Sequence, residues 1–423
     1  MEKGKDRGMI GIANKNDKMS AIRHTAWIVI LCILLPAQAC LSGGAESLEV
    51  WSNSRVGRIP MQVLRRAIAR QRPGDITRPV FRFACAGKKL VAHTSLDQDL
   101  QSYLDSLMVD ALGRMTAIVC LDPVSGRVLA LAGFDKQMPG TNVWTQELVP
   151  SASIFKIVTA AGAIELMHMN PGTVFHFNGG KHTLYRYQLQ NKINRHTERV
   201  SLSEAFSESI NPVFGKIGAM YLRKKGLLSM ARRFMWGKEI PFELPVKKST
   251  ISVSDNRFSQ AEVASGFNKT TRITALHGVL IVGAIANSGV MMAPSFIDTI
   301  ETEDGTIVYQ GSIYPLGRPV HKRTAEGLFR MMKATVRKGT ARKAFAGWSR
   351  DSVLKKLEIG GKTGTIDNKS HEIRYDWFCG IAREKSGVGS LAVAVIVAHQ
   401  EVLGTRAGRY ARLAIKRYFQ DHQ

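Results

Sequence analysis

The stretch SASIFKIVTA (Ser151–Ala160) places a serine and a lysine three residues apart, directly after a proline and at the start of an apolar segment. In a helix, Ser153 and Lys156 would lie one turn apart on the same face. Taken alone, the pair is explained most simply by a serine that caps the helix and a lysine on its solvent face. The alternative is a nucleophilic serine, because a serine hydroxyl reacts only when a neighbouring base takes its proton.

Two further short motifs favour the second interpretation. Ser209-Ile210-Asn211 lies at a break between helical segments in SESINPVF, and Lys362-Thr363-Gly364-Thr365 follows IGG near the end of the chain. Alone, the first would be a helix C-cap and the second a turn at a strand end. Together with Ser153 and Lys156, in this order, they form the SxxK, SDN-like and KTG set of serine β-lactamases and penicillin-binding proteins.

At these residues the chain resembles the transpeptidase domain of penicillin-binding proteins. The resemblance extends from about Leu90 to the C-terminus. Other segments that are similar to the family are TSLDQDLQ, AIVCLDPVSGRVLALAG, TRITALHGVLIVGAIANSGVMMAP and VRKGTARKAF. A β-lactamase of the same superfamily remains an alternative, although the domain is long for one.

The resemblance assigns a role to each motif residue, and the chemistry of the side chains agrees. A lysine can act as a base only when burial or a nearby positive charge lowers its pKa, and Lys362 would supply that charge. Backbone N–H groups of Ser153 and Thr365 would form the oxyanion hole. The expected catalytic residues are Ser153 as nucleophile, Lys156 as base, Ser209 as proton relay and Lys362; the expected substrate-binding residues are Asn211 for the peptide backbone and Thr363, Gly364 and Thr365, with Lys362, for the terminal carboxylate.

The order of apolar segments predicts an α+β fold. MTAIVCLDPVSGRVLALAGF has the pattern of a hairpin, and three strand-like runs, LEIGGKTGT, YDWFCGIA and GSLAVAVIVAH, lie near the C-terminus. Helical segments fill the middle of the domain, and a last helix follows the strands. We therefore expect a central antiparallel sheet formed from the N- and C-terminal strands of the domain and flanked by helices.

The N-terminal region has the pattern of an export signal. The run AWIVILCILL (Ala26–Leu35) is too short to span a membrane comfortably, and a basic segment precedes it. We expect a cleaved signal peptide with a start at Met1 or Met19; a retained anchor and a lipidated Cys40 are alternatives. The predicted divisions are 1–41 (signal or anchor), 42–113 (linker and small N-terminal region) and 114–423 (transpeptidase domain).

Charge and cysteine content limit the partners. A net charge of +25 favours an anionic partner. Because lysine and arginine are spread along the chain without a nucleic-acid-binding motif, we expect an acidic polymer or membrane surface and no nucleic acid. Cys120 and Cys379 lie in strand-like runs and should be buried, and no cysteine or histidine spacing predicts a metal, so neither metal nor cofactor is expected.

Several conspicuous residues receive a structural interpretation. Tyr185, Tyr187 and His196 lie between the first two motifs and are expected to be framework residues. HEIRY (His371–Tyr375) lacks the second histidine of a zinc motif and is expected to be a loop before a strand.

The sequence predicts an exported serine D,D-transpeptidase that cross-links peptidoglycan stem peptides through an acyl-enzyme on Ser153 and is acylated by β-lactams. It would work in the periplasm or at the outer face of the cytoplasmic membrane. A D,D-carboxypeptidase, a β-lactamase and a non-catalytic β-lactam sensor are the alternatives. Since the region before residue 114 is short for a glycosyltransferase domain, a separate glycosyltransferase is the candidate partner.

Overall fold

The computed structural model describes residues 59–422, so the predicted signal and its cysteines lie outside the described residues. Within this range no helix has both the length and the hydropathy needed to cross a membrane.

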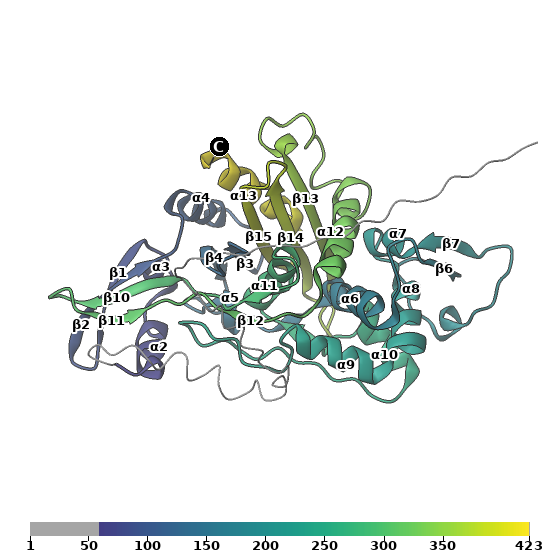
Figure 1. Ribbon diagram of the computed structural model, residues 1–423, viewed down its shortest axis with the longest axis horizontal. Helices are drawn as coiled ribbons and strands as arrows, with labels where there is room; N and C mark the ends of the chain where they lie inside the picture. The colour runs from purple at the N-terminus through teal and green to yellow at the C-terminus, as the bar shows by residue number, and fades with distance from the viewer. Residues whose placement is uncertain (1–58, 423) are drawn as a thin grey trace, which may run out of the picture. The chain divides into compact units, whose positions relative to one another are not determined.

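A five-stranded antiparallel sheet forms the centre of the fold (Figure 1). Its strand order is β13-β14-β15-β3-β4, so the first two strands of the domain pair with the last three, as predicted. The bounds are β3 (Met115–Leu121), β4 (Val128–Asp135), β13 (Leu357–Asp367), β14 (Arg374–Glu384) and β15 (Ser390–His399). The strand that carries the KTG motif, β13, is therefore an edge strand of this sheet.

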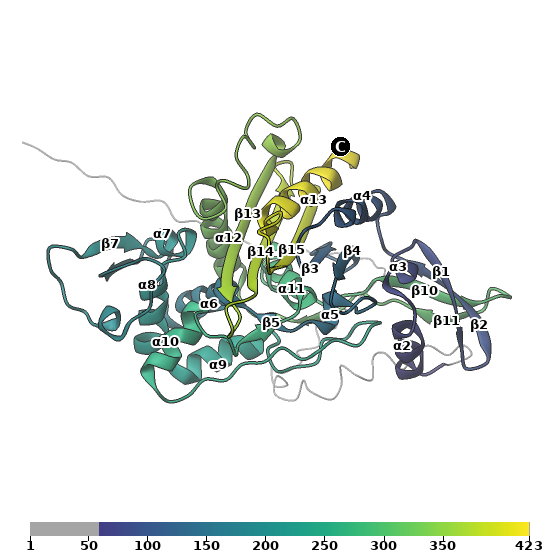
Figure 2. The same ribbon diagram turned by 180° about the vertical axis from the view of Figure 1, so that it is seen from behind.

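Both faces of the sheet are covered, which explains why β3 is buried at every position rather than at alternate ones. Ile118 and Cys120 point into the core beneath α13 (Ala407–Asp421) and α4 (Gln98–Val109). Their neighbours Ala117 and Val119 point into the other core, beneath α11 (Ala275–Ala286). Figures 1 and 2 show α11 and α13 on opposite faces.

The helical block between the two groups of strands surrounds α6 (Phe155–Met167). Residues Phe155 to Ala163 of α6 are all buried, as expected for a mostly apolar helix in the centre of a domain, and they include Lys156. Its neighbours include α8 (Asn211–Lys216), the π-helix η4 (Ile217–Leu222), α9 (Arg223–Arg233), α10 (Arg257–Ser265) and α12 (Lys322–Arg337). A short helix, α7 (Leu202–Ser207), packs on α12, and α12 packs along β13.

A second sheet joins the N-terminal region to the rest of the chain. It has the order β1-β2-β10-β11. The hairpin of β1 and β2 forms its first two strands, and Asp97 caps α4 by accepting a hydrogen bond from the N–H of Leu100 at 2.9 Å. Because β2 pairs with β10, this sheet crosses the boundary predicted near residue 114, and that domain division stays a prediction. The bounds are α2 (Met61–Ala69), β1 (Val80–Cys85), β2 (Lys88–Thr94), β10 (Ile297–Thr302) and β11 (Ile307–Gln310).

Short elements complete the described chain. They are α3 (Pro73–Ile76), α5 (Val143–Gln146), β5 (Val149–Pro150), η2 (Ala152–Ile154), β6 (Val174–Phe177), η3 (Arg186–Leu189), β7 (Glu198–Ser201), β8 (Arg272–Ile273), β9 (Met291–Met292), β12 (Pro315–Gly317) and η5 (Leu354–Lys356).

Candidate active site

Ser153 lies in η2, a 3₁₀ helix of one turn that continues directly into α6. Two tight approaches hold this turn in place. Ala152 has a positive φ of 47°, and a Cβ on Gly266 would lie only 1.8 Å from the Ala152 carbonyl oxygen. On the other side, a Cβ on Gly364 of β13 would lie 3.3 Å from the Ser153 nitrogen. The serine is thus placed between the end of α10 and the KTG strand.

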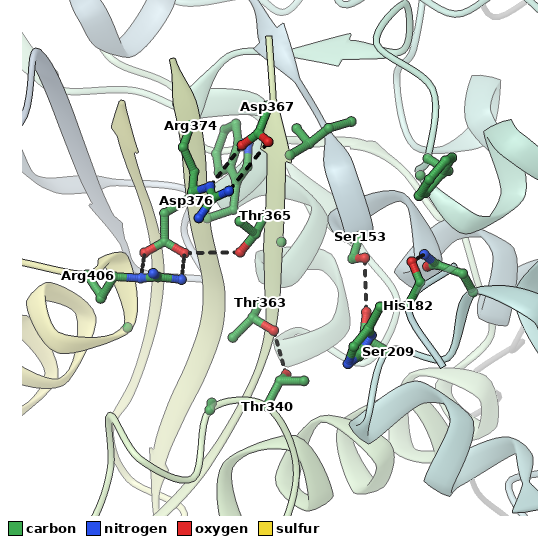
Figure 3. Close-up of a pocket in the computed structure, with 18 of the residues that line it drawn as sticks. Ser153, His182, Ser209, Thr340, Thr363, Thr365, Asp367, Arg374, Asp376 and Arg406 are labelled. Atoms are coloured by element: carbon green, nitrogen blue, oxygen red, sulfur yellow. Dashed lines mark hydrogen bonds and ion pairs between the residues drawn. The ribbon is translucent and has the colours of Figure 1, made fainter. Parts of the chain in front are cut away.

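Hydrogen bonds join the three motifs at Ser153. Its Oγ lies 2.8 Å from Lys156 Nζ and accepts a hydrogen bond from Ser209 Oγ at 2.9 Å. Ser209 Oγ in turn accepts one from Lys362 Nζ at 3.0 Å. Residues separated by 56 and 153 positions in sequence therefore form one continuous chain. Figure 3 shows Ser209 facing Ser153 across the cleft.

The other partners of Lys156 orient its nitrogen. Lys156 Nζ donates to Asn211 Oδ1 at 2.7 Å and to the Ser265 carbonyl oxygen at 2.5 Å. A neutral amine has two N–H donors and one lone pair. Because both donors are used, the lone pair of neutral Lys156 points at the hydroxyl of Ser153.

Burial favours that neutral state. It lowers the pKa of Lys156 far below the usual value for lysine, and the nearby charge of Lys362 lowers it further. Burial also lowers the pKa of Lys362 to about 7. Among the described residues, the hydrogen-bond partners of both ammonium groups are hydroxyl, amide and carbonyl oxygens, not carboxylates that would restore the charged form.

Asn211 has partners other than the predicted substrate backbone. While its Oδ1 accepts from Lys156, its Nδ2 donates to the carbonyl oxygen of His182 at 2.7 Å. The amide therefore connects Lys156 to the segment around His182, and one N–H and one oxygen lone pair stay available to a ligand. Binding of substrate by Asn211 stays a prediction.

Ser209 occupies the break between α7 and α8 that the sequence predicts. Its φ is +59°, an uncommon value for a residue other than glycine. Pro212 follows at the start of α8, where its missing N–H costs no hydrogen bond. This local strain is concentrated at a residue of the hydrogen-bonded chain, a common feature of functional sites.

The motif residues open onto a cleft of about 870 Å³. Its lining includes Ser153, Ser209, Asn211, Thr363, Gly364 and Thr365. The two lysines are fully buried behind this surface. The structure thus brings together all eight residues that the sequence selected.

Other residues of the cleft were not predicted. Among the described lining residues, the carboxylates are Asp367 and Asp376. Arg374 Nε donates to Asp367 at 2.8 Å, and Arg406 Nε donates to Asp376 at 3.0 Å (Figure 3). His371 also lines the cleft, so the predicted loop before β14 contributes to the site. Nothing in the local sequence distinguishes these charges from surface ion pairs.

Tyr185 and Tyr187 stack on each other with ring centroids 5.8 Å apart and are both largely exposed. They and His196 are outside the cleft lining, and their framework role stays a prediction. Cys120 and Cys379 are buried free thiols, as predicted.

Fold and site together have the arrangement of an SxxK motif, with a serine hydroxyl beside a buried lysine. The family model of the penicillin binding protein transpeptidase domain matches residues 116–417, well over half of the chain, and the chain belongs to this family. The family resemblance and the α+β fold class inferred from the sequence are therefore confirmed.

Particular relatives are more distant. The chain is 26% identical over 315 residues to the peptidoglycan D,D-transpeptidase PbpA of Mycobacterium tuberculosis; the match covers 66% of this chain and 61% of PbpA. It therefore spans about six-tenths of the length of that relative.

Solved structures show the same fold. The D,D-transpeptidase domain of a peptidoglycan glycosyltransferase from Eggerthella lenta superposes with a TM-score of 0.64 at 24% identity, covering 78% of this chain and 83% of that one. The penicillin G acyl-enzyme complex of M. tuberculosis penicillin-binding protein A gives a TM-score of 0.59 at 22% identity, covering 77% and 80%.

Proposed function

We propose that this protein is an exported serine D,D-transpeptidase that cross-links peptidoglycan stem peptides. The observation that carries the proposal is the chain Lys362–Ser209–Ser153–Lys156, in which every hydrogen bond can run in the same direction toward the lone pair of Lys156. Family membership and the name of the PbpA relative support the substrate class.

In the first step, Ser153 Oγ attacks the carbonyl carbon of the penultimate D-alanine of a pentapeptide stem. The serine proton moves to Lys156, because burial lowers the pKa of Lys156 and favours the neutral amine that can accept it. Backbone N–H groups at the turn of Ser153 and on the edge strand β13 would stabilise the oxyanion.

In the second step, the peptide C–N bond breaks and terminal D-alanine leaves. Its amine gains the proton that Lys156 took from Ser153, and Ser209, placed between Ser153 and Lys362, is the relay that can deliver it, so Lys156 is neutral again. An acyl ester on Ser153 remains. An amine from a neighbouring stem then attacks this ester, the new C–N bond replaces the C–O bond to Ser153, and the amine proton passes by Lys156 to Ser153 Oγ and restores the hydroxyl.

The edge position of β13 suits a peptide substrate. An extended peptide can pair with the free edge of a sheet through main-chain hydrogen bonds. The terminal carboxylate of the donor would then meet Thr363, Thr365 and the positive charge behind them. The basic surface of the protein suits an acidic polymer and an anionic membrane, where a separate glycosyltransferase would supply the glycan.

Acylation by a fluorescent penicillin, followed over hours on the purified full-length protein, tests the proposal. We expect a long-lived label on the wild type, none on Ser153→Ala, and cross-linking of a stem-peptide mimic to an acceptor amine. Ser151→Ala is a control, because Ser151 lies two residues away, is buried outside the cleft lining, and its hydroxyl has no hydrogen-bond partner in the described structure.

Other outcomes correspond to the alternative functions. Rapid loss of the label with hydrolysis of the drug would identify a β-lactamase. Release of D-alanine without cross-linking, even at high acceptor concentration, would identify a carboxypeptidase. A stable label without turnover of any stem peptide would identify a sensor, and an unlabelled wild type would refute acyl transfer at Ser153.

A further inference from the structure

Thr340 belongs to none of the three motifs, yet it lies in the cleft directly opposite the KTG strand. It follows α12, in the segment VRKGTARKAF. Figure 3 shows its side chain pointing at Thr363. The two hydroxyl oxygens, Thr340 Oγ1 and Thr363 Oγ1, are 2.5 Å apart, and both residues line the cleft.

The backbone around Thr340 is held tightly against the element that carries Ser209. The N–H of Thr340 donates to the carbonyl oxygen of Ser207, the last residue of α7, at 3.1 Å. A Cβ on Gly339 would lie only 2.2 Å from that same oxygen, so this position has no room for a side chain. The next residue, Ala341, donates its N–H to Thr335 of α12 at 3.1 Å. This turn therefore cannot shift independently of Ser207, two residues before Ser209.

Thr340 thus connects two motifs that are far apart in sequence. Its backbone is attached to the Ser209 segment, and its side chain to the residue after Lys362. A threonine on a mobile loop would not fix the hydroxyl of Thr363, whereas one held by two backbone hydrogen bonds and a close glycine contact can.

The direction of the hydroxyl pair matters for anion binding. A hydroxyl has one hydrogen to donate. When Thr340 donates to Thr363 Oγ1, the hydrogen of Thr363 is free to point into the cleft. A hydroxyl that already accepts a hydrogen bond is also a stronger donor, because successive hydrogen bonds polarise one another.

We propose that Thr340 is a positioning residue for recognition of the substrate's terminal carboxylate and that it acts through Thr363. Its hydroxyl donates to Thr363 Oγ1 and directs the Thr363 hydroxyl at the carboxylate of a stem peptide or a β-lactam. This inference rests on the proposed function, since it assigns the carboxylate to the Thr363 side of the cleft.

The test compares Thr340→Val, which removes the hydroxyl at nearly constant shape, with Thr340→Ser, which keeps it. The measured quantity is the second-order rate constant for acylation of Ser153 by benzylpenicillin and by its methyl ester, which lacks the negative charge. We expect Thr340→Val to lower the rate with benzylpenicillin about tenfold and the rate with the ester less than about twofold. Thr340→Ser should stay within about threefold of the wild type for both.

A double-mutant comparison separates action through Thr363 from direct contact with the substrate. If Thr340 acts through Thr363, then Thr340→Val/Thr363→Val reacts at the same rate as Thr363→Val alone. If the double variant instead reacts more slowly than Thr363→Val, by the same factor that Thr340→Val alone loses, the proposal is overturned. An equal loss with benzylpenicillin and with its ester would also overturn it, because it would indicate a purely structural role.

Thermal unfolding of each variant shows whether the fold is kept, and we expect little change because Thr340 is exposed. Failure of this inference is distinguishable from failure of the proposed function. A wild type that is labelled at Ser153 together with an unaffected Thr340→Val refutes only the role of Thr340. A wild type that is never labelled refutes the function itself.

Discussion

Replacing Lys362 by glutamine should move the acid limb of the pH–rate profile for acylation to higher pH. Lys362 and Lys156 are both buried, and the charge of Lys362 lowers the pKa of Lys156. Glutamine removes that charge but keeps a polar group at the end of the side chain. The pKa of Lys156 is then higher, so on acidification Lys156 becomes protonated, and stops acting as a base, at a higher pH than in the wild type.

The hydrogen-bonded chain sets the size of the shift. Three contacts of 2.8, 2.9 and 3.0 Å connect the two lysine nitrogens. Their separation therefore cannot exceed about 9 Å, at which two unit charges in an effective dielectric of about 20 interact by about 1.8 kcal/mol. That energy corresponds to about 1.4 pKa units, and a shorter separation would give more.

The assay is the rate of labelling by fluorescent penicillin between about pH 5 and 9, fitted for the midpoint of the acid limb. Lys343→Gln is the control, because Lys343 is exposed at the rim of the same cleft and its charge is screened by solvent. We expect a rise of at least about one pH unit for Lys362→Gln and almost none for Lys343→Gln. A midpoint that stays in place or falls in Lys362→Gln would refute the electrostatic coupling of the two lysines.

Three further predictions follow from the same contacts. Ser209→Ala should lower the rate of acylation at least about a hundredfold with little change in stability. Ser207→Ala should leave that rate nearly unchanged, because the Ser207 hydroxyl donates to the carbonyl oxygen of Glu204 within α7; the rate of labelling by fluorescent penicillin tests both variants. Gly266→Ala should destabilise the protein by more than about 2 kcal/mol and abolish labelling, because its Cβ would collide with Ala152; Gly237→Ala, with a similar positive φ but open space around it, should cost only about 1 kcal/mol in chemical denaturation. Lys362→Met should raise the free energy of unfolding at pH 7. The pKa of Lys362 is about 7 in the folded protein and near 10.4 in the unfolded chain, so between these values only the unfolded chain holds the proton. The free energy of unfolding of the wild type therefore rises with pH from about 7 to 10. The stability advantage of Lys362→Met should shrink over the same range by about 1.4 kcal/mol per pH unit. An advantage that is independent of pH between 7 and 10 would contradict the last of these.

Local pattern was enough to predict the main elements. The hairpin of β3 and β4, the last three strands and α6 all come from apolar runs whose period and length indicate strand or helix without knowledge of the tertiary fold. The pair Ser153 and Lys156 was also predictable, because one helical turn brings residues three apart together.

The family motifs selected Ser209, Asn211 and Lys362, but only the tertiary structure shows how they act. Asn211 is predicted to bind substrate, and the structure adds that its amide contacts Lys156 and the carbonyl oxygen of His182. No local rule predicts this, because the partners come from three separate segments.

Sequence by itself therefore determined the family, the elements and the identity of the reactive groups, all of which depend on residue type and short spacing. Tertiary packing alone decided the direction of the lone pair of Lys156, the burial that lowers the pKa of both lysines, and the contact between Thr340 and Thr363. The physical reason is that pKa and hydrogen-bond direction depend on which groups surround a side chain in space. Those groups come from α6, α8, α10, β13 and the turn after α12, which meet only when the chain is folded.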